Sequence, residues 1–439
     1  MKPPADQPAE TQFVKIEKPI YGGAFLARLE GKAVFVPLAL PGEEALVRIT
    51  ESKPGFSTAE AEEIVKPAPQ RIAPACPHFG ACGGCHYQHA DYATQLGLKR
   101  AILRETLERG GVAVPAEIGE LAAESPARAW GYRNRIRLAF DAVGNAGYRG
   151  RRSHAVIPVS QCPIAAPLLV QAAQAAALVA REFALRPAEI SLFCNAGESA
   201  LLASVFVASP VKARFDEFAQ AFQQRIPALK GAELVAEGRP ARRGKAEPPR
   251  TVAQWGAASL VYRAAGFDYR VDHGAFFQVN RWLVDALVER VTATQKGALA
   301  WDLFAGVGLF ARQLTGSFDR VVAVESAPSA TQALGANLKG TSGVAVRAAT
   351  LDFLRRNRKR ERPDLIVVDP PRQGLGAEIT TLLAEVDAPT LVYVSCDPAT
   401  LARDLRALAG AGYGIESVTL ADLFPQTFHL ETVVHLRRA

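Results

Sequence analysis

The last third of the chain alternates short apolar runs with stretches of helical periodicity. Four such units follow one another, over 298–314, 320–338, 364–375 and 390–405. In each, an apolar run that predicts a buried strand ends at a glycine turn or at an acidic or thiol side chain, and polar residues with helical spacing come next. Strands alternating with helices predict an open, mostly parallel sheet whose ligands bind beyond the carboxyl ends of the strands.

The first part of the chain has a different pattern. Short alternating runs over 13–65 are separated by glycine turns at intervals of about ten residues, which predicts a small, OB-like β-barrel. A helix is expected over 91–109, and the alanine-rich run 163–180, which contains two glutamines, is expected to be a soluble helix. We therefore predict an α/β protein with three parts: a β-barrel over 11–67, a central α+β domain over 68–275 and a Rossmann-like domain over 276–439.

The net charge of the chain and the positions of its arginines indicate what type of molecule it binds. The formal net charge of the 439 residues is +7, which favours a polyanionic partner, and the N-terminal residues lack the apolar core of a signal peptide. We expect a cytoplasmic protein that does not associate with membranes. If 132–140 is a strand, Arg133, Arg135 and Arg137 share one of its faces, and RNA contact and simple solvation explain that face about equally well. Further arginines at 149–152 favour RNA, whereas the basic runs 239–250 and 355–362 are expected to be a connection and a solvated helix end.

Six cysteines divide into two groups. Cys76, Cys82 and Cys85 lie within ten residues of one another, and Cys162 lies beside a proline and could provide a fourth ligand. Four thiolates suit zinc or an iron–sulfur cluster, and the three-plus-one spacing, with a single CxxC, favours a [4Fe–4S] cluster. Cys194 has no cysteine near it in the sequence and is expected to be a packed strand residue.

The candidate cofactor site lies at the ends of the predicted strands. A glycine turn follows Asp302, and Glu325 ends the second strand, where a carboxylate could accept hydrogen bonds from both hydroxyls of a ribose. No phosphate-binding glycine loop is present, which favours S-adenosylmethionine over a dinucleotide. Asp369 begins Asp-Pro-Pro-Arg at the third strand end, and the arginine in place of an aromatic side chain argues against methylation of an exocyclic amine.

Cys396 stands at the carboxyl end of a predicted strand beside this pocket. A thiolate that attacks carbon 6 of uracil converts carbon 5 into an enolate carbon, which can accept a methyl group; a base must then remove the carbon 5 proton. We expect Cys396 to be that nucleophile, with its thiolate stabilised by the dipole of the following helix. Glu431 is the preferred base and His429 the alternative.

The chain resembles the RNA (uracil-5-)-methyltransferase family, and more closely its ribosomal RNA branch with an N-terminal TRAM domain. The resemblance covers nearly the whole chain. It rests on the cysteine motif over 76–85 with Cys162, and on the segments 276–280, 302–310, 321–325, 369–375, 395–405 and 424–431. It implies Cys396 as nucleophile, Glu431 as general base and a [4Fe–4S] cluster on the four cysteines, needed for folding or RNA binding.

The same resemblance implies the cofactor contacts. Gln278, Phe304, Glu325 and Asp369 would line the S-adenosylmethionine site, with Thr350 near a further contact. Leu309 and Thr350 stand where relatives often carry asparagine, which puts individual hydrogen bonds to the cofactor in doubt.

We therefore expect a monomeric, S-adenosylmethionine-dependent enzyme that forms 5-methyluridine in 23S ribosomal RNA. One alternative is methylation of transfer RNA, because the catalytic motifs are shared. The barrel and the cysteines favour ribosomal RNA, since the usual bacterial transfer RNA enzyme of the family lacks both. A second alternative is an RNA-binding protein without activity. The spacing of the cysteines argues against radical chemistry.

Overall fold

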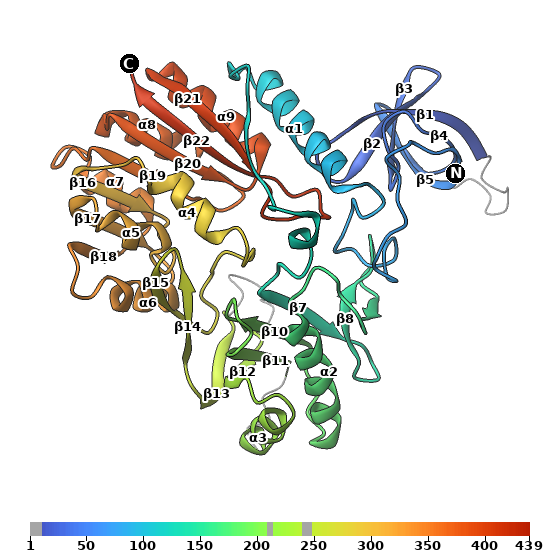
Figure 1. Cartoon of the computed structure of the whole chain (residues 1–439), viewed down its shortest axis with the longest axis horizontal. Helices are drawn as coiled ribbons and strands as arrows, with labels where there is room; N and C mark the ends of the chain where they lie inside the picture. The colour runs from blue at the N-terminus through green and yellow to red at the C-terminus, as the bar shows by residue number, and fades with distance from the viewer. Residues whose placement is uncertain (1–10, 209–213, 239–247) are drawn as a thin grey trace.

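The computed structural model describes residues 11–208, 214–238 and 248–439. The N-terminal barrel, the central part and the C-terminal sheet occupy three corners of the molecule, and the chain segments that join them meet in the middle (Figure 1). The predicted connection over 239–250 lies outside the described residues, except for its last three. None of the described helices has both the length and the apolar character that crossing a bilayer requires.

Five strands close the N-terminal barrel, as the alternating pattern predicted. They are β1 (Thr11–Pro19), β2 (Ala24–Leu29), β3 (Lys32–Pro37), β4 (Glu44–Ser52) and β5 (Phe56–Lys66). Alternate side chains such as Val14, Ile16, Val34 and Val36 point inward and are almost completely buried, which closes the barrel around an apolar core. Figure 1 shows the barrel in blue beside the first helix, α1 (Tyr92–Arg109).

The central part is a seven-stranded sheet in the order β13-β12-β11-β10-β7-β8-β9. Its elements are η1 (Pro126–Ala129), β7 (Arg135–Phe140), β8 (Ala146–Arg149), β9 (Val156–Pro158), α2 (Pro167–Glu182), β10 (Glu189–Cys194), β11 (Leu201–Val207), α3 (Phe215–Arg225), β12 (Leu229–Ala236) and β13 (Arg250–Gly256). The alanine-rich run forms α2, which packs on one face of the sheet with α3. Cys194 is fully buried at the end of β10, as expected of a packing residue.

The C-terminal sheet has eight strands in the order β18-β17-β16-β19-β20-β22-β21-β6. Its elements are α4 (Val284–Thr292), β16 (Gly297–Leu303), α5 (Leu309–Leu314), β17 (Phe318–Glu325), α6 (Pro328–Leu338), β18 (Gly343–Arg347), α7 (Thr350–Asn357), β19 (Leu365–Val368), α8 (Gly376–Val386), β20 (Thr390–Ser395), α9 (Pro398–Gly410), β21 (Tyr413–Ala421) and β22 (Glu431–Arg438). The first five strands of this order are parallel, which confirms the Rossmann-like prediction. The chain order reverses between β16 and β19, and this is where open α/β sheets bind ligands.

Two segments from earlier in the sequence pack on this C-terminal part. The short strand β6 (Gly119–Leu121) pairs with β21, and Ile102, Leu103 and Leu107 of α1 join the core that contains α9. The hairpin β14 (Ser259–Ala264) with β15 (Phe267–Asp272) joins the core on the other face of the sheet. The sheets therefore exchange segments across the domain boundaries predicted from the sequence, and those boundaries stay a prediction.

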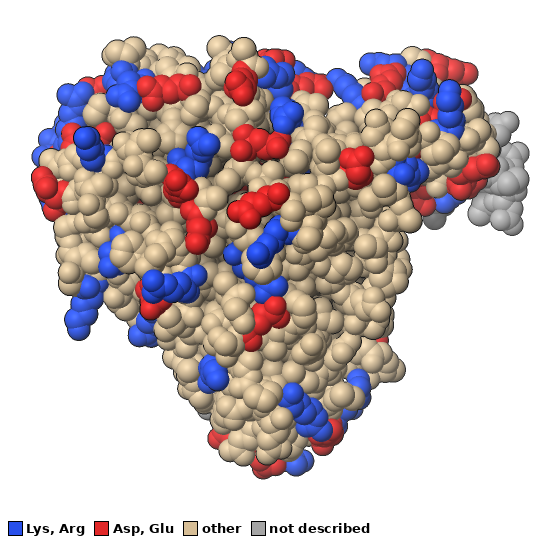
Figure 2. Space-filling model, in the orientation of Figure 1, with Lys and Arg blue, Asp and Glu red and all other residues tan. Residues whose placement is uncertain are grey.

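Ion pairs account for much of the surface charge. On the face shown in Figure 2, lysine and arginine are interspersed with aspartate and glutamate. The basic run at the end of α7 follows this pattern, because Arg355, Arg358 and Arg362 pair with carboxylates of the neighbouring helix and its end. The prediction of a solvated helix end for this run is confirmed.

Candidate active site

The candidate cofactor site lies at the carboxyl ends of β16, β17 and β19, where the chain order of the sheet reverses. Asp302, in β16, is fully buried, and its Oδ2 accepts a hydrogen bond from the Ala311 amide at 2.9 Å. Its Oδ1 is buried and has no hydrogen-bond partner within the described ranges. Burial, together with the charges of Asp369 and Glu325, raises the pKa of Asp302 to about 8. A buried carboxylate oxygen without a partner suits a cationic ligand.

A sharp turn after β16 brings the backbone to the pocket. Phe304 (φ 64°), Gly306 (φ 56°) and Gly308 (φ 90°) all have left-handed backbone conformations. For Phe304 this conformation costs about 1–3 kcal/mol, a strain typical of functional turns. A Cβ at Gly308 would lie 2.6 Å from Leu334 Cδ1, so glycine is required there for helix packing. A Cβ at Gly306 would meet nothing within 4 Å, which leaves the backbone open to a ligand.

Glu325 at the end of β17 is held by backbone amides. Its Oε2 accepts from Gly306 at 3.0 Å, and its Oε1 accepts from Ser326 and Ala327, both at 2.7 Å. Three of the roughly four acceptor positions of a carboxylate are used in this way. The side chain is therefore fixed in direction, with capacity left for a hydroxyl of a bound ribose.

Asp369 and Gln278 meet on the other side of the pocket. Gln278 Nε2 lies 3.4 Å from Asp369 Oδ2, and the buried Asn134 side chain holds the Gln278 carbonyl at 2.8 Å. Burial raises the pKa of Asp369 to about 7. With Asp302 and Glu325, the pocket collects three carboxyl groups, an arrangement that favours a positively charged ligand such as a sulfonium.

The two positions that depart from the family pattern lie at helix starts. Thr350 is buried at the first residue of α7, and Leu309 is buried at the first residue of α5. The Leu309 carbonyl accepts a hydrogen bond from Tyr269 Oη at 3.1 Å, so its backbone is used for packing. An apolar side chain at 309 can give a ligand van der Waals contact but no side-chain hydrogen bond.

Cys396 and Glu431 lie at the ends of neighbouring strands. Cys396 directly follows β20 and Glu431 begins β22, and Ser395 pairs with Thr432 in the antiparallel ladder between them. The next step along the ladder sets Cys396 opposite Glu431. The side chain of Glu431 is buried, and Cys396 is half-buried.

The charge states of these two groups depend on their burial. Burial first, and then the carboxyls of Glu431 and Asp369, raise the pKa of the Cys396 thiol to about 12. Burial and Asp369 likewise raise the pKa of Glu431 well above its ordinary value. Burial and the nearby Arg372 lower the pKa of His429 to about 3, which makes its imidazole a weak base.

The prediction that the dipole of α9 stabilises a Cys396 thiolate is wrong. Asp397 caps α9 and accepts hydrogen bonds from Ala399 and Thr400, at 3.1 and 2.9 Å. The amides at this helix N-terminus are therefore occupied by a carboxylate. That carboxylate offsets the positive end of the dipole, while burial and the carboxyls of Glu431 and Asp369 raise the pKa of the Cys396 thiol.

Aromatic side chains lie beside Cys396 that were not predicted from the sequence. Tyr21, in the β1–β2 turn of the barrel, meets Phe428 edge to face with ring centroids 5.5 Å apart, and Phe428 lies 4.3 Å from the His429 ring. Burial and the neighbouring Asp397 raise the pKa of Tyr21. Arg372 Nη2 donates to His429 Nδ1 at 3.3 Å. The only signal for Tyr21 was the Tyr-Gly-Gly turn that begins at this residue, and nothing local linked it to a strand end nearly four hundred residues away.

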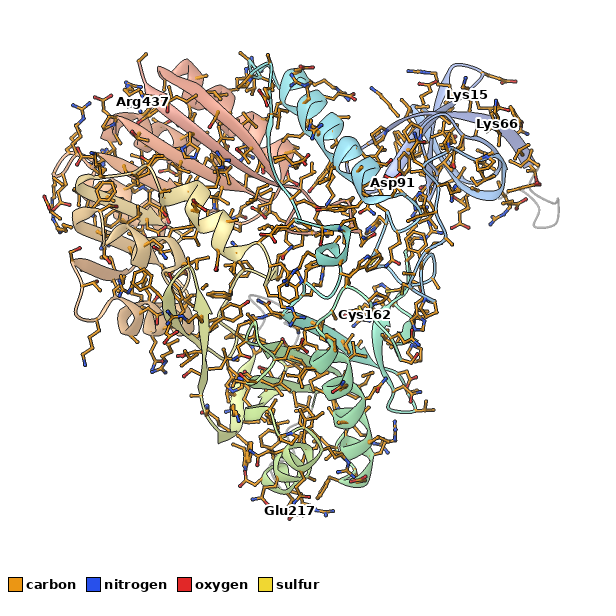
Figure 3. All side chains as sticks on the ribbon, viewed as in Figure 1. Lys15, Lys66, Asp91, Cys162, Glu217 and Arg437 are labelled. Carbon is orange, nitrogen blue, oxygen red and sulfur yellow. The ribbon has the colours of Figure 1, made fainter. Side chains whose placement is uncertain are left out.

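The four predicted metal ligands line one cavity. Cys76, Cys82, Cys85 and Cys162 surround it together with Arg133. Cys162 lies near the middle of the molecule, beside β8 (Figure 3). Burial raises the pKa of the Cys85 thiol to about 12, and Cys162 contributes in the same direction.

The arrangement of these thiols bears on which group they fit. Within the described ranges, no three His, Cys, Asp or Glu side chains are arranged so that they could hold one metal ion. A single zinc ion requires four sulfurs about 2.3 Å from one centre, whereas a four-iron cluster places its ligands at separate corners of a cube, farther apart. The four thiols that line one cavity provide the donor set that a [4Fe–4S] cluster would need, and the cluster stays a prediction.

The predicted arginine strand is shorter than expected and only partly solvated. β7 begins at Arg135, and Arg133 precedes it and lines the cysteine cavity. The Arg135 guanidinium lies 4.4 Å from the Phe193 ring, and Arg137 pairs with Glu189 at 2.6 Å. The cysteine segment covers Arg133, and Phe193 of β10 covers Arg135. Of the three, Arg137 alone is exposed enough for surface contact.

A second basic surface lies at the junction of the barrel and the central sheet. A groove with a volume of about 480 Å³ runs between the β1–β2 turn, the cysteine segment and the loop after β8. Its lining includes Gly22, Gly23, His86, Arg149, Arg151 and Arg152. These are the arginines that the sequence had suggested as RNA contacts, and phosphate oxygens suit such a groove.

The fold and the pocket define an S-adenosylmethionine-dependent methyltransferase, and the comparisons agree. Residues 357–439 match the family model described as tRNA (Uracil-5-)-methyltransferase, and residues 7–61 match the TRAM domain. An uncharacterized RNA methyltransferase of Streptomyces avermitilis is 33% identical, covering 98% of this chain and 99% of its own. The 23S rRNA (uracil(1939)-C(5))-methyltransferase RlmD of Chromohalobacter salexigens is 33% identical, covering 98% and 90%. The chain therefore belongs to the RNA (uracil-5-)-methyltransferase family.

A solved structure supports the fold along the whole chain. The tRNA (uracil-54, C5)-methyltransferase of Pyrococcus abyssi, in complex with S-adenosyl-L-homocysteine, aligns with a TM-score of 0.76 at 22% identity and covers 96% of this chain and 99% of its own. This structure supports the fold, and the relatives above confirm the family resemblance drawn from the motifs.

Proposed function

We propose that this protein methylates carbon 5 of a specific uridine in 23S ribosomal RNA through a covalent adduct with Cys396. The observation that carries the proposal is that Cys396 and Glu431 lie at adjacent strand ends, next to the Ser395–Thr432 pair, with the carboxyls of Glu431 and Asp369 close enough to raise the pKa of the Cys396 thiol. The named 23S ribosomal RNA enzymes among the relatives, at about one-third identity over nearly the full length, support this substrate.

The chemistry follows from these side chains. The Cys396 thiol passes its proton to the adjacent Asp369 carboxylate, and its sulfur bonds to carbon 6 of uracil, which leaves the Glu431 carboxylate free for the later step. Carbon 5 then carries the electron pair, takes the methyl group from the sulfonium and leaves S-adenosylhomocysteine. The Glu431 carboxylate removes the proton from carbon 5, the carbon 5–carbon 6 double bond re-forms, and the bond between carbon 6 and sulfur breaks.

The pocket residues position the methyl donor. Glu325 would accept the ribose hydroxyls, while Gln278 and Asp369 would contact the methionine end, with Phe304 at the turn and Thr350 near the adenine. Three carboxyl groups would offset the positive charges of the sulfonium and the ammonium. The uridine must leave its stack to reach Cys396, and Tyr21 and Phe428 offer planar surfaces beside it.

Cys76, Cys82, Cys85 and Cys162 would hold a [4Fe–4S] cluster. When bound, the cluster would cross-link the segment after the barrel to the central sheet, with a structural contribution to folding or RNA binding. We further propose the division into 11–67, 68–275 and 276–439, with the central part holding RNA, and a monomeric enzyme in the cytoplasm.

Methylation of transfer RNA is the second candidate, supported by the family model and by the fold of the Pyrococcus enzyme. One experiment separates the candidates. Ribosomal and transfer RNA from cells lacking the gene are each incubated with the protein and labelled S-adenosylmethionine, and 5-methyluridine is mapped by mass spectrometry. Label in 23S RNA alone supports the first candidate, and label in transfer RNA alone supports the second.

The Cys396→Ala variant serves as the matched control for the covalent route. It should bind cofactor and RNA with unchanged affinity and form no product, because the alanine cannot bond to carbon 6. Substantial turnover by this variant would refute the route through Cys396, and absence of label from every RNA with the native protein would favour a silent RNA-binding protein.

A further inference from the structure

The loop that leads into Glu431 is held by distant segments of the chain. It spans 422–430, between the end of β21 and the start of β22, and Gln426 near its middle has a left-handed backbone (φ 68°). Gln426 is almost completely buried. A left-handed glutamine costs about 1–3 kcal/mol and persists where its surroundings fix it.

The cysteine segment provides the first hold. The backbone amides of His86 and Tyr87, which directly follow Cys85, both donate to the Gln426 carbonyl, at 2.9 and 3.0 Å. The ring of His86 lies 4.6 Å from the Phe428 ring in the same loop. Whatever fixes Cys85 therefore also fixes the position of this loop.

Helix α1 provides the second hold. Gln95 accepts from the Gln426 amide through Oε1 at 2.9 Å and donates through Nε2 to Gln426 Oε1 at 2.9 Å. One turn further along, Lys99 is fully buried and donates to Asp422 at 2.5 Å and to the Phe424 carbonyl at 2.9 Å. Helix α1 runs from Asp91, beside the barrel, toward the C-terminal sheet (Figure 3).

The residues around the cysteine cavity provide the third hold. Tyr132 Oη donates to the Pro425 carbonyl at 3.0 Å, and Tyr132 precedes Arg133, which lines that cavity. Asn280 donates to the Leu423 carbonyl at 3.1 Å. Carbonyls and amides of the loop are thus bonded to other segments of the chain, and its path into β22 depends on those segments.

We propose that the cysteine segment and α1 act as a clamp that positions Glu431 for proton removal, with Gln95 as the main positioning residue. The inference rests on the proposed function, in which Glu431 is the base and the cysteines hold a cluster. Cys396 lies between β20 and α9, outside the 422–430 loop, and makes none of the hydrogen bonds that hold that loop. Loosening the clamp therefore slows the proton removal by Glu431 more than the attack by Cys396, and the covalent adduct accumulates.

The test compares the full-length native protein with Gln95→Met, which keeps the side-chain volume and removes both hydrogen bonds to Gln426. The matched control is Thr292→Val, which removes a buried side-chain hydrogen bond within α4 and none to the 422–430 loop. Hydrogen exchange of the 422–430 peptide, kcat and KM for S-adenosylmethionine, and the fraction of enzyme bound to RNA on a denaturing gel are measured. A third protein, Cys85→Ala, asks by exchange alone whether the cysteine segment holds the same loop.

In Gln95→Met, loop exchange should accelerate and kcat should fall by about fivefold or more, because one lost buried hydrogen bond alone corresponds to about that factor and two are lost here. The adduct fraction should rise, KM for the cofactor should change less than twofold, and Thr292→Val should match the native protein in all four readouts. Loop exchange should also accelerate in Cys85→Ala. Unchanged exchange of 422–430 in Gln95→Met overturns the inference, as does faster exchange with unchanged kcat and adduct. Hydrogen exchange of the loop does not depend on which residue is the catalytic base. If Glu431 is not the base, the Glu431→Gln protein accumulates no adduct, and this result is distinct from an unchanged exchange rate in Gln95→Met.

Discussion

Replacing Glu431 with glutamine separates the two halves of the proposed reaction. Glutamine has the shape of a protonated glutamate, and burial with Asp369 already favours the protonated form of Glu431 in the free protein. The variant should therefore fold normally and keep the approach to Cys396. What it loses is the carboxylate that takes the proton from carbon 5.

The size of the effect follows from that loss. A positioned general base contributes typically about 10²–10⁴-fold, so kcat should fall by that factor. Attack by Cys396 and methyl transfer both come before the proton leaves carbon 5, so neither step needs Glu431 as a base. The variant enzyme should therefore accumulate as a methylated RNA adduct. His429 cannot replace the base well, since its pKa is lowered to about 3.

The assay is a denaturing gel of enzyme, labelled RNA and S-adenosylmethionine, with kcat from methyl transfer. A slowly migrating labelled band is expected for Glu431→Gln, and the double variant with Cys396→Ala should lack it. Glu416→Gln, in an exposed ion pair with Arg437 on the far end of β22, is the matched control and should resemble the native protein. A variant that retains turnover, or one that loses turnover without forming the band, would refute Glu431 as the base.

Three further predictions follow from the site and its supports. The affinity for S-adenosylmethionine should rise as the pH passes through about 7 and then about 8, the pKa values of Asp369 and Asp302. Each carboxyl is neutral below its pKa and attracts a cation only above it. Calorimetric titration from pH 6 to 9 measures this affinity, and an affinity that does not change with pH would contradict the prediction. Lys99→Met should lower the free energy of unfolding in urea by about 3–5 kcal/mol, because it leaves Asp422 buried without its cation. The control Lys18→Met removes an exposed ion pair and should lower the same free energy by less than about 1 kcal/mol. Cys162→Ala should abolish bound iron measured by elemental analysis, while Cys194→Ala should retain it, and equal iron in both would remove the cluster assignment.

The parts of the site that could be predicted from the sequence depend on local signals. Asp302, Glu325, Asp369 and Cys396 each follow a short apolar run, and parallel strands bring their carboxyl ends to one edge of the sheet. Apolar periodicity was enough to predict β16, β17, β19 and β20 but not β18, and the ends of the predicted strands were enough to select the candidate site residues. The same reasoning placed α1 within one residue of its observed start.

The parts that could not be predicted depend on contacts between distant segments. Arg133 alternates with apolar neighbours as an exposed strand residue would, yet it lies in the cysteine cavity because the chain turns inward before β7. Tyr21 reaches the catalytic loop only because the barrel packs there. Periodicity reports which face of an element is apolar but not which element covers that face.

The high pKa of Cys396 fits an enzyme that must handle one reactive thiol selectively. A thiolate exposed in the free protein would react with any electrophile, whereas a neutral thiol beside two carboxyls is unreactive until a substrate changes its surroundings. Arg372 already acts to lower this pKa, and a bound sulfonium near Asp369 would offset the carboxylate charge that raises it. Under the proposed mechanism, cofactor binding would then make the Cys396 thiol more acidic, and the carboxyls that attract the methyl donor would also keep that thiol neutral until the donor binds.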